Sequence, residues 1–174
     1  MKTTVNKVIR GKISKEDLIY IAGLFDGEGH IFITEDKRPA YKTSLHILRT
    51  GITNTNREVI EWVYSLFPAT WEMRIRNKNH PHWKPCFFWE ASSNKALYFI
   101  KMIYPYLRIK KEQARLAIEF QEKWQDRRYL NNRNTKGQIK KTSSKIYKKR
   151  QWYKEKIGLL NIKKSPTETK RSNT

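Results

Sequence analysis

The stretch IAGLFDGEG, residues 21–29, combines side chains that could do chemistry with residues that a helix disfavours. IAGLF predicts a helix, yet Gly23 and Gly27 each cost a helix roughly 0.5–1 kcal/mol relative to alanine. Asp26 and Glu28 place negative charge in the last turn, where the helix macrodipole opposes it. This helix end therefore carries residues that its own folding does not favour.

A close helix partner and a cation would offset these penalties. Ala22, Gly23 and Gly27 lack bulk, so another helix could approach very closely along that face. The carboxylate oxygens of Asp26 and Glu28 suit Mg²⁺ better than Zn²⁺. The alternative is a core helix that happens to contain glycine and whose terminal charges are solvated.

The positioning elements follow from periodicity and turn residues. The pattern predicts helices over 15–27, 56–66, 93–104 and 109–126, and strands over 30–36, 42–54, 69–77 and 83–91. Ser14 with Asp17, and Thr55 with Glu58, are typical of capping boxes. Gly29 is predicted to end the first helix in a left-handed conformation.

Two hairpins separated by helices predict an α+β fold with one antiparallel sheet and helices on one of its faces. In the second strand, we expect His46, Leu48, Thr50 and Ile52 to share one side. Pro85 predicts that the strand over 83–91 begins at a sheet edge. Alternation in TWEMRIRNK places a charged row on the open face beside Arg49: Glu72, Arg74, Arg76 and Lys78. Such a face could enter a DNA groove, where arginine reads guanine; the alternative is an ordinary solvated strand face.

Charge is the strongest global signal. The 174 residues contain 37 Lys and Arg against 16 Asp and Glu, a net charge of +21, which favours a polyanionic partner. Nucleic acid is the first candidate and an anionic membrane surface the second, although no helix has one basic and one apolar face. The longest apolar run is too short to span a bilayer, and no secretory signal is recognisable. The single cysteine, Cys86, excludes an internal disulfide and favours an intracellular, reducing location.

The positive charge is concentrated near the C-terminus. Residues 131–174 carry 14 Lys and Arg against two Asp and Glu. We expect residues 1–130 to form the core and residues 131–174 to form a basic tail, helical around 145–159, that contacts a phosphate backbone. A solvated, irregular terminus is the alternative.

The sequence IAGLFDGEG resembles the nine-residue signature of the LAGLIDADG homing endonucleases. Five positions are identical to it: Ala22, Gly23, Leu24, Asp26 and Gly29. Ile21 and Phe25 are apolar substitutions, Gly27 replaces alanine and Glu28 replaces aspartate. The resemblance covers residues 14–126 and implies an αββαββα(α) fold with a four-stranded antiparallel sheet that binds DNA.

The resemblance also implies a catalytic site. In this family the motif helices pack at a pseudo-twofold or true twofold axis. The eighth-position acid, here Glu28, binds divalent cations: Mg²⁺, or alternatively Mn²⁺ or Ca²⁺. Gly27 is implied as a second metal ligand. Only one motif is present, which resembles the homodimeric members and implies a near-palindromic DNA target. The implied interface consists of Ala22, Gly23, Asp26 and Gly27.

Two further catalytic residues come from the resemblance. Asn54, at the end of the second strand, holds the place of a side chain that orients the attacking water; alternatively it is only a turn residue. Lys110, before the last long helix, holds the place of a lysine that reaches the active site; alternatively it is one of many solvated lysines. Arg57 could line the site as well, although Glu58 competes for the aligned position.

The implied function is site-specific, metal-dependent cleavage of both strands of a long double-stranded DNA target, as in intron homing. The groove contacts that we expect are Phe32, Thr34, Arg38, Arg49, Arg74, Arg76 and Lys78. The alternative is a non-cleaving intron maturase or RNA-binding protein on the same scaffold. The chain would work wherever the host DNA lies, in an organelle or in prokaryotic cytoplasm.

Overall fold

A computed structural model describes residues 13–36, 44–74, 84–124 and 143–162. The expected order of helices and strands is confirmed. The elements are α1 (Lys15–Glu28), β1 (Gly29–Asp36), β2 (Leu45–Asn54), α2 (Arg57–Leu66), β3 (Thr70–Arg74), β4 (Cys86–Ser92), α3 (Ser93–Ile103), the 3₁₀ turn η1 (Tyr104–Tyr106), α4 (Lys111–Lys123) and α6 (Ser144–Asn161).

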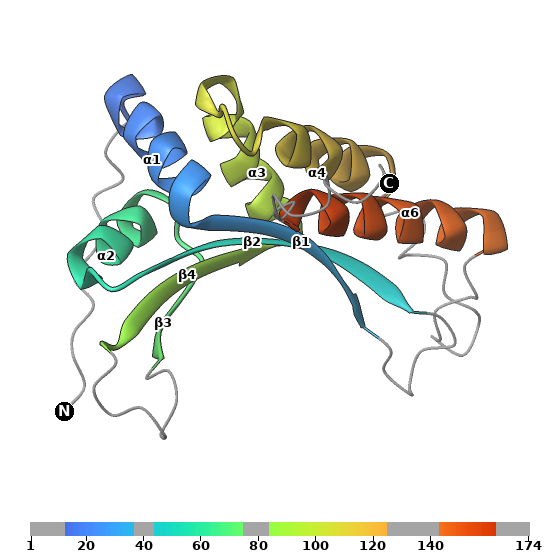
Figure 1. Cartoon of the computed structure of the whole chain (residues 1–174), viewed down its shortest axis with the longest axis horizontal. Coiled ribbons are helices and arrows are strands. Elements are labelled where there is room, and N and C mark those ends of the chain that lie inside the picture. Colours follow the sequence, from blue (N-terminus) through green and yellow to red (C-terminus); the bar gives the residue numbers. More distant parts are fainter. Residues whose placement is uncertain (1–12, 37–43, 75–83, 125–142, 163–174) are drawn as a thin grey trace, which may run out of the picture.

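The four strands form one antiparallel sheet in the order β1-β2-β4-β3. Figure 1 shows the helices on one side of this curved sheet, and no described helix covers its other side. We call this uncovered side the open face. The expected edge position of the strand after Pro85 is wrong, because β4 pairs with both β2 and β3. Pro85 precedes Cys86, the first paired residue, so its missing N–H does not interrupt the ladder.

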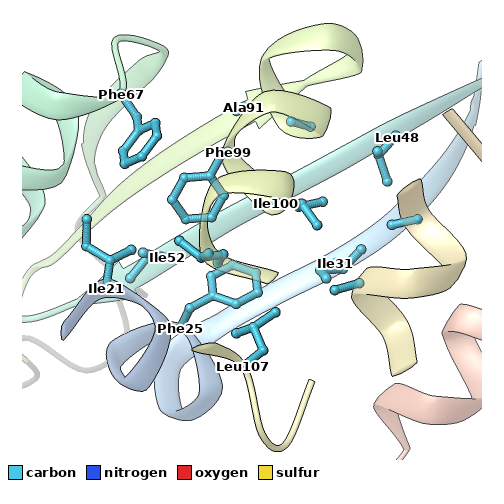
Figure 2. Packing of buried hydrophobic residues seen from close by; sticks show 14 of the residues in the cluster. Ile21, Phe25, Ile31, Leu48, Ile52, Phe67, Ala91, Phe99, Ile100 and Leu107 are labelled. Atoms are coloured by element: carbon cyan, nitrogen blue, oxygen red, sulfur yellow. The ribbon is translucent and has the colours of Figure 1, made fainter. Parts of the chain in front are cut away.

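The core lies between the sheet and the helices. The prediction that His46, Leu48, Thr50 and Ile52 share one side of β2 is confirmed, and that side faces the core, since all four are buried. Figure 2 shows Phe25 of α1 against Phe99 of α3, with ring centroids 5.4 Å apart. This packing joins the end of α1 to α3 within the core.

Two of the three predicted helix boundaries need correction. The Ser14–Asp17 capping box is confirmed by hydrogen bonds of 3.0 and 3.1 Å. Helix α2 is instead capped by Asn56, whose Oδ1 accepts from Val59 N at 3.2 Å, so the predicted Thr55–Glu58 box does not form. Gly29 has φ −79° and begins β1 in extended conformation, rather than ending α1 in the left-handed region.

Helix α6 confirms the helix expected near the C-terminus, but it packs on the sheet rather than standing apart. Tyr153 and Ile157 are buried in the same apolar cluster as the rest of the core. Glu35 of β1 accepts hydrogen bonds from Tyr147 at 3.0 Å and Lys154 at 3.1 Å. The expected boundary at residue 130 therefore does not separate two packing units. Among the described helices, none is long and apolar enough to cross a membrane.

Candidate active site at the end of the first helix

Helix α1 has a buried inner side and an exposed outer side. Leu18, Ile21, Ala22 and Phe25 form the inner side. The outer side carries Tyr20, Gly23 and Gly27, and the Tyr20 side chain is 57% exposed. Ala22 was expected at an interface with a second chain, but it is 1% exposed and lies in its own core. It falls one helical turn after Leu18, on the side that faces the sheet.

The outer glycines have space around them. No atom of the described chain lies within 4 Å of the place that a Cβ would take at Gly23 or Gly27. At Gly29, by contrast, a Cβ would lie 2.3 Å from the Phe25 ring. Gly29 is therefore required by local packing, whereas nothing in the described chain requires the outer two glycines.

Asp26 connects the end of α1 to the start of α4. Its carboxylate accepts backbone hydrogen bonds from Arg108 at 2.8 Å, Ile109 at 3.1 Å and Lys110 at 2.9 Å. These N–H groups precede the N-terminus of α4, where a negative charge is favourable. The charge that opposes the dipole of α1 is thus stabilised by α4. Asp26, expected at a dimer interface, is engaged within its own chain.

This connection also places Lys110. The Lys110 ammonium donates to the backbone carbonyl oxygen of Asp26, in the last turn of α1. Its positive charge contributes to lowering the pKa of His30. Lys110 therefore lies at the same helix end as Glu28, as the resemblance implies, although it does not line the pocket described next.

A pocket of about 370 Å³ opens beside Glu28. Its lining residues come from α1, from β1, from β4 and from the end of β2: Glu28, His30, Thr53, Asn54, Thr55 and Cys86. Glu28 and Asn54, predicted from separate parts of the sequence, thus meet in one place. The Asn54 Oδ1 accepts from Asn56 N at 2.8 Å, so the residue also makes the turn that the alternative reading assigned to it. The Asn54 amide NH₂ remains as a donor for the pocket.

Sequence reasoning missed His30, which lines the same pocket. Its ring lies over Gly51, where a Cβ would come within 2.8 Å of it. Burial lowers the pKa of His30; the negative charge of Glu90 opposes this change and the positive charge of Lys110 adds to it. Strand alternation from the end of the motif could have placed His30 beside Glu28 on the open face.

The open face holds several of the predicted DNA contacts. Phe32 of β1 pairs directly with Arg49 of β2. Arg49 is ion-paired with Glu90 of β4 at 2.5 Å and donates to the Thr34 hydroxyl at 3.4 Å. The backbone of Arg74 pairs with that of Cys86, and its side chain is outside the description. Three further predicted contacts lie outside the described residues: Arg38, Arg76 and Lys78.

Arg57 does not lie in the pocket. Its guanidinium pairs with Glu61 at 2.8 Å, one turn further along α2. Arg57 therefore makes an ion pair on the surface of α2. Glu58 does not line the pocket either.

The donor set beside Glu28 is incomplete for a cation. In the part of the chain that the structure describes, no three acidic, histidine or cysteine side chains cluster to hold a metal. One chain offers the Glu28 carboxylate and the Gly27 backbone carbonyl at an exposed helix end. These oxygens fit a hard ion such as Mg²⁺, which prefers six oxygen ligands, only if other molecules supply the rest.

Comparison with known proteins finds solved structures with a similar fold. No protein-family model matches the sequence, and no curated protein matches it in sequence. Among solved structures, the homing endonuclease I-CvuI in complex with the I-CreI target is similar with a TM-score of 0.64 at 17% identity, covering 87% of this chain and 86% of that chain. The archaeal intron-encoded homing endonuclease I-Vdi141I complexed with DNA gives 0.63 at 15% identity, covering 86% and 87%.

A third structure differs in the share of its own chain that is matched. The LAGLIDADG homing endonuclease I-LtrWI, bound to target DNA, has a TM-score of 0.63 at 18% identity, with 87% of this chain but 47% of that chain covered. Each of the three similarities covers 86% or 87% of this chain. The chain has the fold of the LAGLIDADG homing endonucleases.

Proposed function

We propose that this chain is a divalent-metal-dependent, site-specific DNA endonuclease that acts as a homodimer. The observation that carries the proposal is the environment of Glu28. It is an exposed carboxylate at the mouth of a polar pocket and, within the described part of the chain, makes no hydrogen bond or ion pair. Beside it lies the open side of α1, where Gly23 and Gly27 would let a second α1 helix approach.

The homodimer would complete the donor set. Two α1 helices packed through their outer glycines would bring the two Glu28 carboxylates and two Gly27 carbonyls to one place. The coverage of known structures supports this arrangement. The chain matches most of I-CvuI but about half of I-LtrWI, as expected for a unit that is half of a complete site.

DNA is the substrate that fits the open face. The net charge of +21 favours a phosphate backbone, and the similar structures named above are complexes with DNA. A twofold-symmetric dimer reads two related half-sites, so the target would be long and nearly palindromic. Intron homing is the setting in which such an enzyme would act.

Four residues near the end of α1 would each have a distinct part in the reaction. Glu28 and Gly27 would hold the divalent cation, which when bound neutralises charge on the phosphate and on the departing 3′-oxygen. The Asn54 amide would orient the attacking water. The Lys110 ammonium, held by the carbonyl of Asp26, would stabilise negative charge in the transition state.

The test starts with duplexes selected for binding from a random library in Ca²⁺, which are then exposed to Mg²⁺. We expect the wild-type chain to cut both strands and a chelator to stop it. Glu28→Gln should bind the same duplexes but cut them about a thousandfold more slowly, because the cation loses a ligand. Glu16→Gln, which removes a carboxylate from the other end of α1, is the matched control and should cut normally.

Two results would contradict the proposal. Cutting by Glu28→Gln at the wild-type rate would exclude Glu28 from the site. Tight binding by the wild-type chain without any cutting would instead support the maturase or RNA-binding alternative.

A further inference from the structure

Building on the proposed endonuclease function, we propose that Arg49 and Glu90 act as one unit that reads a single guanine·cytosine pair in each half-site. The two residues lie on neighbouring strands, β2 and β4, at the centre of the open face. Arg49 Nη1 donates to Glu90 Oε1 at 2.5 Å. Arg49 Nε donates to the Thr34 Oγ1 of β1 at 3.4 Å. The guanidinium is therefore held from both neighbouring strands.

The strand register explains how Glu90 reaches Arg49. Arg49 pairs directly with Ser92, and Glu90 pairs with Gly51, so the ion pair runs diagonally across the two strands. Gly51 cannot carry a side chain, because a Cβ there would lie 2.6 Å from the Trp89 backbone oxygen. The absence of a side chain at Gly51 leaves the path between the carboxylate and the guanidinium open.

Folding stability does not account for this pair. The Arg49 and Glu90 side chains are 37% and 24% exposed, on the side of the sheet away from the core. Ion pairs with this much solvent contact contribute little to stability. The pair instead fixes the plane of a guanidinium that faces the space where DNA would lie.

The neighbouring carboxylate favours a base over a phosphate as the ligand. Glu90 neutralises Arg49 and would repel a phosphate group brought to the same spot. A base edge carries no net charge and is not repelled. The lysines and arginines elsewhere in this basic chain can supply the phosphate contacts.

The hydrogen-bonding pattern favours one base pair in particular. The two contacts within the protein use Nε and one Nη1 donor of the five guanidinium donors, so donors remain for a ligand. Guanine offers two acceptors, N7 and O6, in the major groove, and its cytosine partner offers the N4 donor. Arginine donors beside a glutamate acceptor complement this pattern. Within the described residues, Glu90 Oε2 has no hydrogen-bond partner, which leaves it to accept from cytosine.

The experiment measures base preference at every position of duplexes selected from a random library by the purified dimer. The wild-type protein should show one strongly preferred guanine in each half-site. Arg49→Lys should lower that preference roughly tenfold, because lysine lacks the planar fork, and leave the other positions unchanged. Glu90→Gln should relax the same position while raising affinity for non-specific DNA, because a negative charge is removed.

Glu122→Gln is the matched control for charge. Glu122 is ion-paired with Lys101 on the helix layer, so this variant makes the same charge change away from the open face. It should leave every base preference unchanged. In Glu90→Gln, the guanine preference should fall while the affinity for non-specific DNA rises. A folding defect would lower both quantities, so this result distinguishes a positioning role from a structural one.

Three results would overturn the inference, and they show whether the endonuclease proposal fails with it. An unchanged guanine preference in both Arg49→Lys and Glu90→Gln would overturn this inference while leaving the endonuclease proposal intact. A uniform loss of binding and thermal stability in Glu90→Gln would make the pair structural and would also overturn the inference. A wild-type protein that selects no duplex at all would overturn the endonuclease proposal, and the inference with it.

Discussion

The glycines around the motif fall into two groups with different causes. Gly29 and Gly51 are crowded, because a Cβ there would meet the Phe25 ring at 2.3 Å and the Trp89 backbone oxygen at 2.6 Å. Gly23 and Gly27 face outward, where the described chain leaves open space. The crowded pair is explained by the folding of one chain. The outer pair weakens α1 without any gain inside the chain, which points to a molecule outside it.

The carboxylates of the motif divide in the same way. Asp26 accepts three backbone hydrogen bonds and is satisfied within the chain. Glu28, two residues later, has no partner in the described part of the chain. The folding of one chain does not explain a carboxylate without a partner, such as that of Glu28. Four variants test this division, taken from the largest expected change in folding stability to the smallest.

Gly51→Ala should cause the largest loss. The added methyl group would meet a backbone oxygen that cannot rotate away, so we expect about 3 kcal/mol of destabilisation. Urea unfolding measures it. Gly158→Ala is the control, because nothing lies within 4 Å of that position in α6, and it should stabilise the helix by about 0.5–1 kcal/mol. Equal stability of the two variants would remove the distinction between crowded and open glycines.

Asp26→Ala should cost about 2 kcal/mol, because three backbone N–H groups lose their acceptor. The proposed DNA cleavage should fall as well, since the segment that carries Lys110 would no longer be held at the end of α1. The control is Glu112→Ala, an exposed acid in the first turn of the same helix α4, ion-paired with Arg115 at 2.7 Å. Its loss should cost less than about 1 kcal/mol. A similar cost for both variants would mean that Asp26 is an ordinary surface charge.

Much of the fold could be predicted because its signals are local. The Ser14–Asp17 capping box and the alternation of His46, Leu48, Thr50 and Ile52 each depend on near neighbours in the chain. The meeting of Glu28 with Asn54 was predicted through the family resemblance, which supplies a long-range contact that periodicity cannot.

What the sequence did not reveal depends on contacts between distant residues. Asp26 was expected at an interface because of the family resemblance, and nothing local indicates that residues 108–110 donate to it. The apolar side of α6 was hidden by six lysines and arginines in the same 18 residues, so its packing on β1 was missed. Glu90 was not considered for the open face, because its pairing with Arg49 depends on the order of β2 and β4.

Glu35→Gln tests a carboxylate that is satisfied like Asp26, at the contact between β1 and α6. Burial raises the pKa of Glu35, but hydrogen bonds from Lys154, Ser44 and Tyr147 outweigh burial and lower the pKa to about 2. Its contribution to stability is therefore complete above pH 4.5, its ordinary value, and is lost as the pH falls toward 2. The variant should lose about 1 kcal/mol at neutral pH and show a smaller further loss below pH 4.5.

Unfolding at pH 7, 5 and 3, followed by tryptophan fluorescence, measures this change. Burial also lowers the pKa of His46, opposed by its hydrogen bond with Gln151. As the pH falls below 6.5, His46 is therefore protonated in the unfolded chain before it is protonated in the folded chain. Wild type and Glu35→Gln should both lose stability between pH 6.5 and 5 for this reason. Glu155→Gln, an exposed position on α6, is the control and should keep the wild-type profile. A Glu35→Gln profile parallel to wild type below pH 4.5 would contradict the assignment.

Of the four variants, Gly23→Leu should change folding stability least and the association of two chains most. The open space at Gly23 accepts a leucine side chain, and leucine favours the helix, so one chain should stay as stable as wild type. A second α1 helix could no longer approach closely, so the dissociation constant of the proposed dimer should rise at least tenfold, as measured by light scattering or sedimentation. Gly158→Leu makes the same change on α6 and should leave association unchanged. If Gly23→Leu dimerises and cuts DNA like wild type, the outer glycines do not mark the contact between chains, and the two Glu28 carboxylates must meet by another route.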